Sequence, residues 1–180
     1  EDQRHVRIMM DAGLIEDATR IWWDMRPRAR CPTLETRVMD ACTKLQDTVA
    51  LTAVLVCINR MLWRLRRRNQ RWRIYTPMLI RETRWRAMRY SFDEGLIDLA
   101  KGEVVPFEDL LDELCSLVAE DARALGCEKD ISRVNDIVTR GTSAHRQLKD
   151  YELERASGAS IEDSLKSVVD VLIADTAEGL

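Results

Sequence analysis

The sequence has few of the residues that build common metal and disulfide sites. It contains only two histidines, His5 and His145, and neither has a second metal ligand at helical spacing. We expect both to be surface or capping residues. The five cysteines are odd in number and form no CxxC pair, so neither a zinc site nor a disulfide framework is indicated. A reducing, cytoplasmic location is the simplest expectation.

Signature motifs and long apolar runs are also missing. The sequence has no GxSxG, P-loop, GxGxxG or HExxH element, which removes the usual basis for a hydrolase, nucleotide-fold or metalloprotease assignment. The longest uncharged run, residues 48–59, is shorter than the roughly 20 residues of a membrane span and predicts a buried helix. Residues 1–10 are charged and lack an initiator Met, so we expect neither a leader nor a membrane anchor, and a chain that begins inside a longer product.

What the sequence does have is a strongly basic centre. The net charge is only -3, but residues 60–89 contain a single acid, Glu82, and eleven arginines, at positions 60, 64, 66, 67, 68, 71, 73, 81, 84, 86 and 89. Acids outnumber bases after Tyr90. We expect the basic and acidic parts to pack together or to meet across a dimer contact.

Aromatic side chains between these arginines raise the alternative of nucleic-acid binding through phosphates and stacking. The acidic pI of about 5.6 and the lack of a recognisable nucleic-acid module argue against it. The interleaved aromatic residues are Trp63, Trp72, Tyr75, Trp85 and Tyr90.

Periodicity predicts an α+β chain, a single domain over residues 1–180 in which an antiparallel sheet segment is followed by a mostly helical part. Its three segments are a helix with a β-hairpin (1–46), basic helices with a small hairpin (47–105) and a helical part (106–180). Expected strands are 19–26, 33–40, 95–99 and 103–107. Expected helices are 3–13, 47–68 with Asp47 or Thr48 as its cap, 76–90, 107–125, 130–140, 143–156 and 161–178.

The first hairpin carries the best candidate site. Period-2 geometry places Glu35 and Arg37 on one face of the second strand, and Trp22, Asp24 and Arg26 on the polar face of the first. A carboxylate beside an arginine suits a magnesium-nucleotide site, with a hard oxygen for the metal and a forked donor for phosphate. The alternative, which spacing alone favours, is a cross-strand salt bridge on a solvated face.

Four segments resemble the carboxylate-amine ligases that are similar to type 2 glutamate-cysteine ligases. They are IEDATRIWWDMRPRARCPTLETRVMD (15–40), RETRWRAMRYSFDEGLIDL (81–99), GTSAHRQL (141–148) and VVDVLIADTAEGL (168–180). The resemblance covers nearly the whole chain and corresponds to the C-terminal half of such a ligase. It implies a glutamine-synthetase/glutamate-cysteine-ligase-like fold, in which an antiparallel sheet curves around the site.

The same resemblance implies roles for individual residues. Glu35 matches the metal-binding glutamate, and Arg37 matches a phosphate-contacting arginine with a catalytic role. Asp24, Arg26 and Trp23 belong to the WDxRP loop, which is expected to position substrate. Two further expected phosphate contacts lie on a helix where Thr83 and Ser91 replace the usual Asn and Gly; these contacts are Arg86 and Arg89.

The implied activity uses ATP and Mg2+ to join a glutamate-like carboxylate to a small amine through an acyl phosphate. The expected partners are the amino acid and amine substrates, the N-terminal half of the ligase in the same or a separate chain, and a second copy of the protein. The alternative is a binding or regulatory module that keeps the ligase scaffold but is catalytically incomplete.

Overall fold

The computed structural model describes residues 2–28 and 31–178. Its contacts divide the chain into two compact units, Glu1–Ala41 and Cys42–Leu180. The chain is mostly helical and its two small sheets are antiparallel, so the α+β class is confirmed.

Unit 1 contains a short helix and a small hairpin. Helix α1 spans Asp2–Asp11, and the chain then turns at Gly13, whose φ of 69° suits glycine. A 3-10 turn, η1 (Ala18–Arg20), precedes β1 (Met25–Pro27) and β2 (Leu34–Thr36). The strands are antiparallel, and Arg26 lies opposite Glu35.

Both predicted strands of this hairpin were too long. Residues 18–20 are not extended because the Asp17 carboxylate caps them, accepting a hydrogen bond from the Thr19 N–H at 2.7 Å. The carbonyls of Thr19 and Ile21 accept hydrogen bonds from the Arg26 guanidinium rather than from a neighbouring strand. Pairing is therefore limited to three residues on each side.

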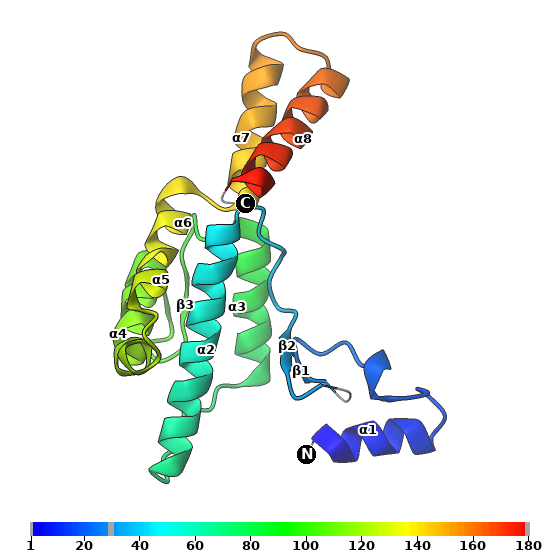
Figure 1. Ribbon diagram of the computed structural model, residues 1–180, viewed down its shortest axis with the longest axis vertical. Coiled ribbons are helices and arrows are strands. Elements are labelled where there is room, and N and C mark those ends of the chain that lie inside the picture. Colours follow the sequence, from blue (N-terminus) through cyan, green and yellow to red (C-terminus); the bar gives the residue numbers. More distant parts are fainter. Residues whose placement is uncertain (1, 29–30, 179–180) are drawn as a thin grey trace. The chain divides into compact units, whose positions relative to one another are not determined.

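Unit 2 is built around the long helix α2 (Figure 1). Its elements are α2 (Leu45–Arg67), α3 (Pro77–Tyr90), β3 (Leu96–Asp98), β4 (Glu103–Val105), α4 (Phe107–Leu125), α5 (Glu128–Ser132), α6 (Val134–Arg140), α7 (Ser143–Ala156) and α8 (Ile161–Ala177). These agree with most of the predicted helices and with the small second hairpin.

The core of unit 2 lies between α2, α4 and α5. Ala53, Cys57 and Met61 recur every four residues on α2, so they share one face. They pack against Val118 and Ala122 of α4 and against Ile131 of α5. Burial of this apolar stripe is the main packing interaction that holds the two long helices together.

Helix α2 is, among the described residues, the one helix long and apolar enough to cross a membrane by length and composition. Its packing gives another explanation of its apolar character. Cys57 is fully buried in the core, while Arg60 and Arg64 on the same helix form ion pairs with Asp121 of α4. These contacts place one face of α2 in the core, but only 22% of its most apolar 18-residue window is buried, so the prediction of a buried helix holds for that face alone.

Two helix ends differ from the predictions. Helix α2 begins at Leu45, two residues before the expected cap, and Asp47 is instead buried and paired with Arg140 at 2.5 Å. The expected helix 130–140 is broken into α5 and α6. At the break, the Ser132 hydroxyl donates a hydrogen bond to the Lys129 carbonyl. The Arg133 N–H donates to the Asp130 carbonyl, three residues earlier, which makes a tighter turn.

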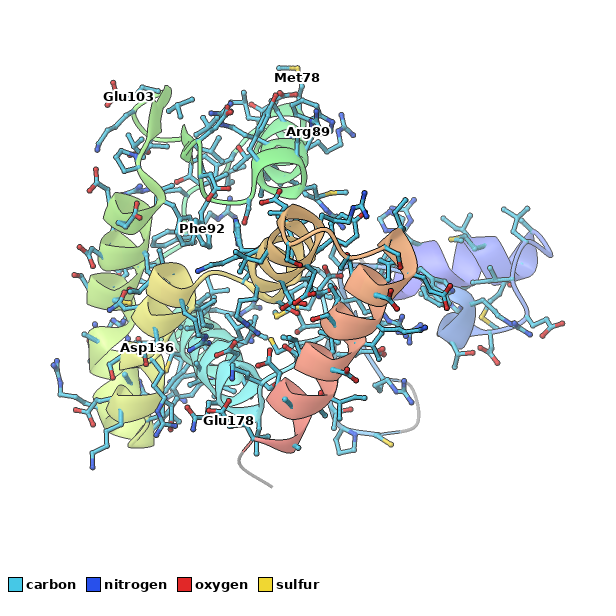
Figure 2. The ribbon with its side chains drawn as sticks, turned by 90° about the horizontal axis from the view of Figure 1, so that it is seen from above. Met78, Arg89, Phe92, Glu103, Asp136 and Glu178 are labelled. Atoms are coloured by element: carbon cyan, nitrogen blue, oxygen red, sulfur yellow. The ribbon has the colours of Figure 1, made fainter. Side chains whose placement is uncertain are left out.

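Helices α7 and α8 form an antiparallel hairpin whose ends are capped as expected. The Thr142 hydroxyl and the His145 ring form a capping box, with Nδ1 2.8 Å from that hydroxyl and accepting the Thr142 N–H at 3.1 Å. The expectation that His145 is a capping residue is thus confirmed. Its ring also lies against Phe92, labelled in Figure 2, with 4.8 Å between the centroids and a tilt of 32° between the planes.

Candidate functional site

Four charged side chains meet at the hairpin of unit 1, and we call them the Glu35 cluster: Arg26, Arg28, Glu35 and Arg37. Oε2 of Glu35 accepts hydrogen bonds from Nη2 of Arg26 at 2.7 Å and from Nη1 of Arg28 at 3.2 Å. Oε1 pairs with Nη2 of Arg37 at 2.6 Å. Both carboxylate oxygens are therefore held by guanidinium groups.

Arg26 is the anchor of this cluster. It is only 7% exposed, and its Nη1 donates to the carbonyls of Ile21 at 2.7 Å and Thr19 at 2.8 Å. A buried guanidinium needs such a full set of acceptors to offset the loss of water. Arg26 therefore fixes the hairpin to the preceding turn and holds Glu35 in position from the buried side of the cluster.

Arg37 and Arg28 form the accessible edge of the cluster. The Arg37 guanidinium lies 4.5 Å from the centre of the Trp22 ring, and its backbone N–H donates to the Asp24 carbonyl at 2.7 Å. Trp22 and Arg28 are both exposed. Of the five side chains predicted to converge on one surface, Trp22, Arg26, Glu35 and Arg37 do meet, and Asp24 joins them through its backbone carbonyl. Trp23, expected to position substrate, is half-buried.

The charges in the Glu35 cluster do not balance. One carboxylate faces three guanidinium groups, which leaves two positive charges within these four residues. The hydrogen bond from Arg26, then that from Arg28, lowers the pKa of Glu35 to about 2 against the opposing effect of partial burial. Such a cluster attracts an anion with several oxygens, such as a phosphate group.

This low pKa predicts an acid-sensitive hairpin. The Glu35 pKa falls from 4.5 to about 2 on folding, so its ion pairs stabilise the folded state above about pH 5 and lose that effect as the pH drops toward 2. Urea unfolding at pH 7, 4 and 2 should show a smaller pH dependence in Glu35→Gln. The exposed Glu16, paired with Arg20, supplies the matched control Glu16→Gln. Equal pH dependence in all three proteins would contradict this role.

The donor set fits phosphate better than it fits a metal alone. Glu35 supplies one hard carboxylate ligand, whereas a divalent cation needs several oxygens. Within residues 2–28 and 31–178, no group of three or more His, Cys, Asp or Glu side chains could hold a metal ion. A metal ion at Glu35 would therefore need its remaining ligands from substrate, water or another segment.

The two other predicted phosphate contacts lie on α3 in unit 2. Arg86 donates from Nε to the Gly95 carbonyl at 2.9 Å and from Nη2 to the Glu94 carbonyl at 2.5 Å, so it also closes the turn after α3. Arg89, labelled in Figure 2, is exposed, with its guanidinium 5.8 Å from the Tyr90 ring centre. Their phosphate role stays a prediction.

Arg28 was missed as a site residue, although a signal was present. It follows Arg26 by two residues, so the period of a strand places both on one face. Because it follows Pro27, Arg28 was assigned to the loop between the strands. The structure makes it a partner of Glu35.

A second polar cluster, also missed, joins three helix ends of unit 2. Asp175 near the end of α8 pairs with Arg146 of α7 at 2.7 Å and with Lys44 before α2 at 3.0 Å. Burial opposes its ionisation, but these cations hold the pKa of Asp175 below its usual value. Two of the segments that carry the ligase resemblance, 141–148 and 168–180, therefore meet here as a structural contact.

Comparison with known proteins identifies the class of this chain. Residues 1–170 match the model of a family described as "Glutamate-cysteine ligase family 2". The chain belongs to that family, and the resemblance found in the sequence is confirmed.

The similar proteins share one name, "Putative glutamate--cysteine ligase 2". The protein from Rhodospirillum rubrum is 53% identical over 180 residues, which cover 100% of this chain and 46% of that protein. The one from Jannaschia sp. is 48% identical over 175 residues, 97% of this chain and 46% of that protein. The one from Paracoccus denitrificans is 43% identical over 173 residues, 96% and 46% respectively. The chain thus spans about half the length of these curated relatives.

Proposed function

We propose that this chain is the C-terminal part of an ATP- and Mg2+-dependent ligase that joins a glutamate-like carboxylate to a small amine. The observation that carries the proposal is the Glu35 cluster, whose excess positive charge lies at an accessible hairpin edge. Arg26 belongs to the WDMRP segment, and Glu35 and Arg37 belong to the PTLETR segment, which carry the resemblance to the family; Arg28 directly follows the first segment. The hairpin would then be one wall of a larger, glutamine-synthetase-like sheet.

In the proposed reaction, a carboxylate oxygen of the acid attacks the γ-phosphorus of ATP and ADP leaves. The amine nitrogen then attacks the carbonyl carbon of the acyl phosphate, and phosphate departs as the amide forms. Arg37 and Arg28 would bind the phosphoryl oxygens, where negative charge gathers. Mg2+ supplies further charge neutralisation when bound, and Glu35 is the residue of this cluster that would hold it.

The rest of the proposed site divides between positioning and binding. Asp24, Arg26 and Trp23 would position the amino acid substrate, with Arg26 acting mainly through Glu35. Arg86 and Arg89 would add contacts to the nucleotide phosphates. We further propose a cytoplasmic protein that works as a homo-oligomer, with the N-terminal half of the ligase supplying the other metal ligands.

The test is phosphate release from ATP by the full-length protein, screened across pairs of amino acids and amines. The proposal expects release that requires an acid, an amine and Mg2+ together. ATP binding without release for any pair would instead favour the alternative, a regulatory module that retains the scaffold. Release that needs no amine would exclude amide formation.

Arg37→Lys should lower kcat/KM for ATP by about 10- to 100-fold, because lysine keeps the charge but lacks the bidentate fork. The exposed Arg20, paired with Glu16, provides the control Arg20→Lys, which should change the rate less than about twofold. Steady-state kinetics at varied ATP separates the two. A near-normal rate for Arg37→Lys would make this arginine structural.

A further inference from the structure

Two cysteines from distant parts of the sequence meet in the core of unit 2. Cys57 lies on α2, and Cys127 directly follows Gly126, where α4 ends. Their Sγ atoms are 3.4 Å apart. Cys57 is fully buried, whereas Cys127 is half-buried.

The backbone holds both thiols in place. Cys57 is flanked on its face by Ala53 and Met61 of the core. The Cys127 N–H donates to the Ala122 carbonyl at 3.1 Å, which completes the left-handed turn at Gly126. A disulfide bond of about 2.05 Å requires the two sulfurs to approach by about 1.4 Å.

We propose that Cys57 and Cys127 are an oxidisable thiol pair that a peroxide converts into a disulfide between α2 and the α4–α5 turn. The first step occurs at Cys127, the more accessible sulfur. Its thiolate attacks one peroxide oxygen, the O–O bond breaks, and with hydrogen peroxide the products are a sulfenic acid and a hydroxide, which becomes water by taking up the proton that the thiol released. The Cys57 sulfur then attacks the sulfenic sulfur, and its proton leaves with the hydroxide as a second water. Two thiols are oxidised while the peroxide is reduced.

The surroundings assign the order of these steps. Burial, followed by the contact with Cys127, raises the pKa of Cys57 to about 12, so Cys57 is a poor first nucleophile. Its fixed position beside Cys127 compensates in the second step, which is intramolecular. Burial also raises the pKa of Cys42 and Cys115, which makes them slow to react.

The cross-link has a structural consequence. It would close a loop between residues 57 and 127 and tie the basic helix α2 to the end of the acidic helix α4. Loop closure restricts the unfolded chain, so the oxidised form should melt roughly 5–10 °C higher than the reduced form. This site is independent of the proposed ligase activity.

The full-length protein is treated with hydrogen peroxide under native conditions, alkylated, digested without reduction and analysed by mass spectrometry. The expected product is a linked peptide pair containing Cys57 and Cys127, lighter by two hydrogens than the sum of the free peptides. Thermal unfolding with and without dithiothreitol should show the reversible rise in Tm.

Cys127→Ala should lose both the linked peptide and the rise in Tm, and Cys115→Ala, the matched control in the same core, should keep both. Cys127 oxidised to a sulfinic acid while Cys57 is alkylated would overturn the proposal. So would a disulfide from Cys127 to the exposed Cys31, or alkylation of both Cys57 and Cys127 at a peroxide dose that oxidises Cys31.

Discussion

Glu35→Gln in the full-length protein should lower ATP-dependent phosphate release by at least about 1,000-fold. Glutamine keeps the shape of the side chain but removes the charge that holds Arg26, Arg28 and Arg37. It also removes the carboxylate that would bind Mg2+. The three guanidinium groups would then repel one another and lose their alignment toward phosphate oxygens.

Two comparisons separate catalysis from folding in this variant. Glu16→Gln changes an exposed glutamate of the same unit and should leave the rate within about twofold of the parent. Glu35→Asp keeps the charge on a shorter stem, so it should recover part of the activity. Equal phosphate release by Glu35→Gln and its parent would show that Glu35 is only the salt bridge that spacing alone suggested.

Three members of the Glu35 cluster, Arg26, Glu35 and Arg37, could be predicted because strand periodicity is a property of the backbone. Residues two apart share a face, so Glu35 and Arg37 had to lie together wherever the strand began. The lengths of the strands could not be predicted in the same way. The strand lengths depend on the Asp17 cap and on the hydrogen bonds from Arg26 to two backbone carbonyls. The period-2 pattern does not predict these contacts.

Several helix ends carry a chemical signal, although Asp47 was a misleading one, and the interior break carries none. Gly126, Thr142 and Ser160 mark ends or starts as their residue types require. The break at Arg133 depends on the Lys129 carbonyl, which accepts from the Ser132 hydroxyl instead of from a backbone N–H of a continuing helix. Serine also occurs within unbroken helices. Local sequence does not reveal whether the side-chain bond or the backbone helix bond forms.

Long-range ion pairs mark the limit of a single sequence. The charge segregation predicted that basic and acidic parts pack together, and the pairs of α2 with α4 confirm it. Charge segregation could not predict individual pairs such as Asp47 with Arg140. These two residues are 93 positions apart, and the tertiary fold brings them together. For the same reason, Arg146 and Asp175 were noticed as parts of motifs and not as a pair.

Asp121→Asn should cost about 3 kcal/mol of the free energy of unfolding, the largest stability effect that we expect from one substitution in unit 2. Asp121 is 0% exposed and accepts hydrogen bonds from Arg60 at 2.5 Å and from Nη2 of Arg64 at 2.8 Å. The bond from Arg64 is the main reason that the pKa of Asp121 stays below its usual value. Asparagine is uncharged, and its NH2 group can only donate hydrogen bonds. One of the two guanidinium groups would therefore face another donor instead of a carboxylate oxygen.

Urea unfolding followed by helical circular dichroism measures this loss, because α2 and α4 are the longest helices of the unit. Asp112→Asn, on the exposed side of α4, is the matched control and should change stability by less than about 0.5 kcal/mol. Arg64→Met removes the ion pairs of Arg64 with Glu120 and Asp121 but leaves Arg60 paired with Asp121, so it should cost less than Asp121→Asn. A loss below about 1 kcal/mol in Asp121→Asn would mean that desolvation of the carboxylate nearly cancels its ion pairs, and that apolar packing alone joins α2 to α4.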